Sequence, residues 1–162
     1  MFKRAIPIDE LPQFADLPIQ RICVGPAERN LAVCVSGDLA SPSLPIVCIP
    51  GYVRNMLDFV ALRTALGRIA GHNRAVVLLD LAGRGRSPAL PEDAEYSTLS
   101  DAENVCAAVT ALGIGKAIFL GQGHGGQVTM ALARRRPRLV GATILVDSGP
   151  VTDPRGLVRM RN

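Results

Sequence analysis

The sequence contains no apolar run long enough to cross a bilayer, which excludes a membrane-spanning helix of ordinary length. Its first residues lack the apolar core of a secretory signal, because Pro7, Asp9, Glu10 and Pro12 interrupt them. The four cysteines form no C-x-x-C pair, and three of them lie in apolar, strand-like runs. We therefore expect buried, reduced thiols and a cytoplasmic protein without membrane contacts.

Histidine is also scarce. The 162 residues hold two, and no spacing of His, Cys and Asp is typical of a metal site, so we predict neither a metal ion nor another cofactor. The net charge of +4 includes a basic run at 134–138, the kind of cluster that can bind nucleic acid. No aromatic residue interleaves with this run, and Pro137 would end a helix there. We expect a solvated helix end and no nucleic-acid partner.

The length and composition of the chain predict one globular domain spanning 1–162, with a core from about 20 to 150. Hydrophobic residues make up 48% of the chain and charged residues 20%. We expect strands at 21–24, 30–36, 44–49, 74–81, 116–120 and 140–146. We expect helices at 56–69 and 124–135. A further helix begins at the cap residue Ser100, with Glu103 completing a capping box. This alternation predicts an α/β fold: a mostly parallel, doubly wound sheet of about six strands, with the first two strands as an antiparallel edge.

The glycine-rich stretch 121–126 lies between a predicted strand and a predicted helix. Gly121, Gly123 and Gly126 satisfy G-x-G-x-x-G, the spacing of a dinucleotide-binding turn. Asp147 follows the next strand, at the place where an acidic residue would hold the ribose hydroxyls of NAD. Too little sequence follows Asp147 for another strand–helix–strand unit, so NAD-type binding is the lesser of two interpretations.

The stronger interpretation rests on three phrases that occur in order. These are Pro50-Gly51-Tyr52 after a strand, Asp80-x-x-Gly83-x-Gly85-x-Ser87 after the next strand, and the 121–126 loop. In this order the chain resembles the N-terminal half of an α/β-hydrolase, from about residue 20 to its end. The loop is then a nucleophile elbow, G-x-S-x-G, with Gly123 where the serine should be. The resemblance implies a truncated α/β-hydrolase fold, with 151–162 as the start of a cap helix.

The resemblance also assigns the parts of the site. It places an oxyanion hole at the backbone N–H groups of Tyr52 and His124, which would donate to a developing negative charge. It gives Gly121 and Gly125 the task of letting the strand turn sharply into the helix, and it gives Gly126 the task of letting that helix pack closely on the sheet. A small-molecule ligand is the expected partner of such a site.

The catalytic groups themselves are missing from the expected places. Gly123 offers no atom that could form a covalent intermediate, and no late histidine is present to act as base. Asp147 is a candidate acid, and the alternative is a loop aspartate at the start of a cap. We therefore expect an impaired or inactive relative of ester-type hydrolases, with a non-catalytic binding protein as the alternative. The last strand would be an uncovered sheet edge that favours self-association.

Overall fold

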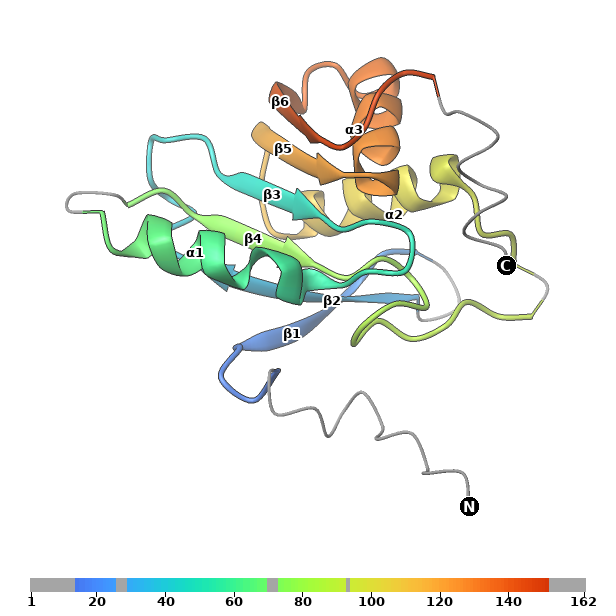
Figure 1. Cartoon of the computed structure of the whole chain (residues 1–162), viewed down its shortest axis with the longest axis horizontal. Helices are drawn as coiled ribbons and strands as arrows, with labels where there is room; N and C mark the ends of the chain where they lie inside the picture. Colours follow the sequence, from blue (N-terminus) through green and yellow to red (C-terminus); the bar gives the residue numbers. More distant parts are fainter. Residues whose placement is uncertain (1–13, 26–28, 70–72, 93, 152–162) are drawn as a thin grey trace.

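The protein is an α/β fold built on one six-stranded sheet, shown in Figure 1. The computed structural model describes residues 14–25, 29–69, 73–92 and 94–151. The strands are β1 (Ile19–Cys23), β2 (Asn30–Ser36), β3 (Ile46–Ile49), β4 (Val76–Leu79), β5 (Ala117–Gln122) and β6 (Val140–Val146). Their order across the sheet is β1-β2-β4-β3-β5-β6. The strands from β3 to β6 pair in parallel, while β1 and β2 form the predicted antiparallel edge.

The helices lie on both faces of the sheet (Figure 1). A short 3-10 turn, η3 (Met56–Phe59), leads into α1 (Val60–Gly67); α2 (Thr98–Ala111) and α3 (His124–Arg135) follow. Alternate residues of the buried strands serve opposite faces, as the period of a strand requires. Val47, Val77 and Phe119 pack in the core that holds α2 and α3. Cys48 and Leu78 pack in the second core, with η3 and α1.

The predicted elements are confirmed with two adjustments: the helix predicted at 56–69 is divided into η3 and α1, and the cap of α2 differs. The strands at 30–36 and 140–146 and the helix at 124–135 have the predicted bounds. The prediction of the α2 cap was wrong by one turn, because the N-cap residue is Ser97 and not Ser100. The backbone of Ser97 is extended, at φ −139° and ψ 158°, and its hydroxyl accepts a hydrogen bond from the Ser100 amide at 3.1 Å. Ser100 therefore lies in the first turn, where its own amide needs the cap.

The cysteines are only partly as predicted. All four are free thiols, and Cys34 and Cys48 are buried. Burial raises the pKa of the Cys48 thiol to about 12, so it stays protonated and unreactive. Cys106 is half-buried, whereas Cys23 is exposed because it ends the edge strand β1. The expectation of a buried thiol at Cys23 was therefore wrong.

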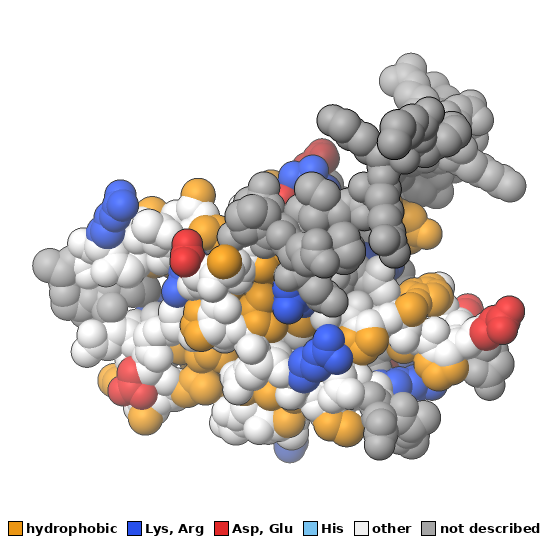
Figure 2. All heavy atoms as spheres, turned by 90° about the horizontal axis from the view of Figure 1, so that it is seen from below, with side chains coloured by type: hydrophobic (Ala, Val, Ile, Leu, Met, Phe, Trp, Pro, Cys, Tyr) orange, Lys and Arg blue, Asp and Glu red, His pale blue; other side chains and the backbone are white. Residues whose placement is uncertain are grey.

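The surface carries dispersed charge on the face shown in Figure 2, where Lys and Arg side chains lie among apolar and acidic ones. Within the described part of the chain, no helix combines the length and the apolar character needed to span a membrane.

Candidate functional site

The predicted elbow is a sharp turn at the carboxyl end of β5. Gly123 connects β5 to α3 with φ +52° and ψ −115°, a conformation that side-chain-bearing residues rarely adopt. Its amide donates to the Val146 carbonyl at 2.9 Å, and its own carbonyl accepts from the Gly126 amide at 3.0 Å. The turn is therefore fixed to β6 on one side and to the first turn of α3 on the other.

Close packing around the elbow explains three of its four glycines. A Cβ on Gly121 would overlap the Gly125 carbonyl, and a Cβ on Gly125 would overlap the Ile49 carbonyl at the end of β3. A Cβ on Gly126 would collide with the Ser148 side chain. Gly123 differs, because a Cβ there would meet no atom within 4 Å. The space in which a nucleophile side chain would stand is open, and glycine leaves it without a reactive atom.

The loop after β3 lies beside the elbow. The position of a Cβ on Gly51 is 3.6 Å from the Gln122 carbonyl oxygen. The Tyr52 ring meets the His124 ring edge-on, with 5.8 Å between their centroids. The two residues assigned to the oxyanion hole are thus neighbours at this edge of the sheet. The alignment of their amides toward a ligand stays a prediction.

A buried ionic network lies behind the elbow and was not predicted from the sequence. Asp101, on the first turn of α2, accepts from Arg84 Nη1 at 3.3 Å and lies 2.9 Å from His124 Nε2. The side chains of Asp101, Arg84 and His124 are 3%, 12% and 13% exposed, so all three are largely shielded from water. The His124 ring is thereby bound to α2.

Arg84 ties this network to the loop after β3. Its Nε donates to the Tyr52 carbonyl at 3.0 Å, and its Nη1 donates to the Ala82 carbonyl at 2.9 Å. The guanidinium also lies over the rings of Tyr52 and Tyr96, at 5.4 and 5.8 Å from their centroids. One cation therefore holds together the loop after β3, the segment between β4 and α2, and α2 itself.

A second buried carboxylate, Asp80, organises the glycine-rich loop after β4. Its two oxygens accept from the backbone amides of Met56 at 2.6 Å and Arg86 at 2.7 Å. Burial raises the pKa of Asp80 to about 6, and these two amide donors oppose that rise. A Cβ on Gly85, whose φ is +53°, would collide with the Asp80 carboxyl. The carboxylate therefore has a structural role, joining η3 to the loop.

Asp147, the predicted acid, comes directly after Val146, whose carbonyl accepts from the elbow amide of Gly123. It follows β6 with φ +49°, the one positive φ of a non-glycine residue within the described ranges, and its side chain is exposed. The histidine in those ranges, His124, is engaged by Asp101, while His72 and the predicted cap helix beyond 151 lie outside them. The acid role of Asp147 stays a prediction, as does NAD-type binding by the glycine loop.

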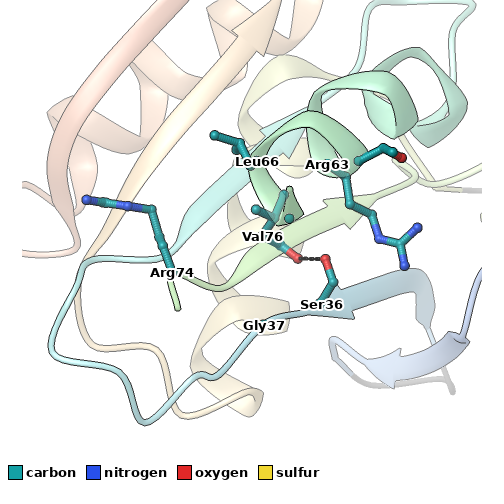
Figure 3. Close-up of a pocket in the computed structure, with 8 residues that line it drawn as sticks. Ser36, Gly37, Arg63, Leu66, Arg74 and Val76 are labelled. Atoms are coloured by element: carbon teal, nitrogen blue, oxygen red, sulfur yellow. Dashed lines mark hydrogen bonds between the residues drawn. The ribbon is translucent and has the colours of Figure 1, made fainter. Parts of the chain in front are cut away.

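Two surface pockets lie away from the elbow. Figure 3 shows the first, between α1 and the ends of β2 and β4, where the Ser36 hydroxyl donates to the Val76 carbonyl at 3.4 Å. Arg63 and Arg74 extend from it in different directions (Figure 3). The second pocket is bordered by Cys106, Ile114 and the basic end of α3. Neither of these two pockets includes Gly123.

The sheet order and the elbow geometry agree with the comparison with known proteins. Residues 45–160 match the family described as alpha/beta hydrolase fold. The chain belongs to this α/β-hydrolase family, and the predicted resemblance and fold class are confirmed. This membership favours the elbow interpretation of 121–126 over dinucleotide binding.

Individual relatives are similar over most of this chain. It is 32% identical over 139 residues to 3-hydroxybutyrate-oligomer hydrolase of Cupriavidus necator, covering 85% of this chain and 46% of the relative. It is 31% identical over 126 residues to the sn-1-specific diacylglycerol lipase ABHD11 of Mus musculus, covering 78% and 38%. The crystal structure of an alpha/beta hydrolase from Novosphingobium aromaticivorans aligns with a TM-score of 0.78 and 28% identity, covering 90% of this chain and 49% of that one. The chain thus spans less than half the length of each.

Proposed function

We propose that this protein binds an ester-type small molecule at the elbow edge of the sheet and is impaired as a hydrolase. Gly123 carries the proposal, because it adopts the strained elbow turn and leaves the nucleophile position open. Without a hydroxyl or thiol at that position, no covalent acyl intermediate can form there. The names of the relatives, an oligomer hydrolase and a diacylglycerol lipase, support an ester-type ligand.

The remaining machinery in this proposal is electrostatic. The amides of Tyr52 and His124 would donate to the carbonyl oxygen of a bound ester, and the positive end of α3 would act on the same point. Water would then be the attacking group, without a positioned base. Oxyanion stabilisation and binding alone give accelerations of about 10³–10⁴-fold over water in hydrolases that lack their triad. Residual activity of this chain should not exceed that range, and pure binding is the limiting case.

The proposal predicts that a serine alone does not restore fast turnover. In Gly123→Ser the new hydroxyl would enter open space, but the neighbouring His124 has its Nε2 bound to Asp101. No base would therefore take the serine proton, and hydrolysis of p-nitrophenyl acetate should stay within about tenfold of the unmodified chain. Steady-state release of p-nitrophenol measures this directly.

Gly123→Ala is the matched control, because it imposes the same backbone strain without a hydroxyl. We expect the serine and alanine variants to have similar rates. If the serine variant hydrolysed the ester a thousandfold faster than the alanine variant, a base would be in reach and the proposal would be wrong.

A further inference from the structure

The pocket beside α1 lies at the opposite end of the sheet from the elbow. It has a volume of about 290 Å³ and is lined from α1, from the end of β2 and from the start of β4 (Figure 3). Val76, one of its lining residues, begins β4, whereas the elbow follows the last residue of β5, and both strands run parallel to β3. The pocket is therefore at the amino ends of the parallel strands and is separate from the elbow.

The Arg63 guanidinium, which lines this pocket, has no partner within the described part of the chain. Arg63 lies on α1 and is half-buried, and its Nε is buried without a hydrogen-bond partner. Burial raises the pKa of the Cys34 thiol on β2, and the charge of Arg63 opposes that rise, so this charge lies near the core. Arginines that are withdrawn from water usually have an oxygen partner, as Arg84 has in Asp101. Arg63 is an exception that calls for a ligand.

The other residues of the pocket suit a negatively charged ligand. None of its described lining residues is acidic, and Arg74 contributes a second positive charge while its Nη1 donates to the Leu44 carbonyl at 2.6 Å. The Ser36 hydroxyl donates to the Val76 carbonyl at 3.4 Å, which is longer than an ordinary O–H···O bond, so it is free to turn toward a better acceptor. In Figure 3, Arg63 extends from α1 toward β2, the strand that carries Ser36, whereas Arg74 points away.

We propose that this pocket binds a small molecule through an oxyanion group, a phosphate or a carboxylate, held by the terminal nitrogens of Arg63 and the hydroxyl of Ser36. A planar guanidinium presents its N–H donors in a fork that matches both groups. The volume of the pocket suits a small ligand. This is a second binding site, and it does not rest on the proposed function.

The proposal is tested by NMR titration of the unmodified chain with inorganic phosphate and, separately, with acetate. Sodium chloride keeps the ionic strength constant, so that general screening of charge does not change during the titration. We expect saturable shifts of the Ser36 and Gly37 amide signals and of the Arg63 Nε–H signal. Binding of either anion supports the proposal, and the tighter of the two identifies the group as phosphate or carboxylate. If neither anion shifts these signals saturably, the proposal is overturned.

Arg63→Gln should weaken binding at least about tenfold, because it removes the charge-assisted hydrogen bonds. Arg63→Lys keeps the charge without the fork and should bind with intermediate affinity. The matched control is Arg68→Gln, since Arg68 is exposed at the end of the same helix and outside the pocket. This control should bind within about twofold of the unmodified chain.

Circular dichroism and the melting temperature establish that each variant is folded before its binding is measured. The proposal is overturned if Arg63→Gln binds the anion as tightly as the unmodified chain. It is also overturned if Arg68→Gln loses as much affinity as Arg63→Gln, because the anion would then respond to the overall positive charge and not to this pocket.

Discussion

Gly125→Ala should destabilise the protein by about 3 kcal/mol or more, the largest effect expected of a single methyl group in this fold. The new Cβ would overlap the carbonyl oxygen of Ile49 and would lie 2.7 Å from that of Pro50. Both atoms are backbone at the end of a central strand, so they cannot move away as a flexible side chain could. Urea denaturation of the unmodified and variant chains measures the loss.

Alanine substitutions at two other glycines are the controls, because a Cβ at either position meets no atom within 4 Å. Gly67 ends α1 in open space, and alanine there should be neutral or stabilising by about 0.5–1 kcal/mol. Gly123 also has open space but a φ of +52°, so Gly123→Ala should cost about 1–3 kcal/mol through backbone strain alone. If Gly125→Ala were no more destabilising than Gly123→Ala, the close contact between α3 and β3 would be wrong.

Asp101→Ala should destabilise the fold by about 3–5 kcal/mol, because it leaves the largely buried Arg84 guanidinium without its carboxylate. Removing one partner of a buried ion pair costs more than the pair contributes, since the remaining charge stays away from water. His124 would lose its partner in the same substitution. Chemical denaturation monitored by circular dichroism gives the free energy of unfolding.

Asp58→Ala provides the comparison for this prediction. Asp58 also pairs with an arginine, but Arg54 is 57% exposed and the two are neighbours on one turn. Water can solvate Arg54 after the substitution, so the loss should be much smaller than for Asp101→Ala. Asp101→Asn, which keeps the shape and an acceptor oxygen, should fall between them. Equal losses for the two alanine variants would contradict the buried network.

The fold could be predicted because its signals are local and repeated. The apolar runs at 30–36 and 140–146 and the amphipathic run at 124–135 have the period of the element that they form. The glycines at 121, 125 and 126 mark places where backbone meets backbone or a packed side chain, which a glycine cluster between a strand and a helix indicates. The α2 boundary was missed because Ser97 and Ser100 are both plausible caps, and only the packing of the preceding loop selects between them.

The ionic network could not be predicted in the same way, because its members are far apart in the sequence. Arg84 lies in the loop after β4, Asp101 in α2 and His124 at the start of α3, and the fold alone brings them together. One signal was available for Asp101: it lies four residues before Val105 and seven before Ala108, on the apolar stripe of α2. A carboxylate on a buried stripe requires a buried partner, but the sequence does not say which one.

The elbow at Gly123 keeps the backbone turn but has no reactive side-chain atom. The most direct test of this is to incubate the folded chain with a fluorophosphonate, which labels activated serines, and to measure the intact mass. We predict no adduct on the unmodified chain, because position 123 has no nucleophile and the histidine beside it is bound to Asp101. Stoichiometric addition of one phosphonyl group would contradict the account, since it would reveal an activated serine elsewhere in the chain.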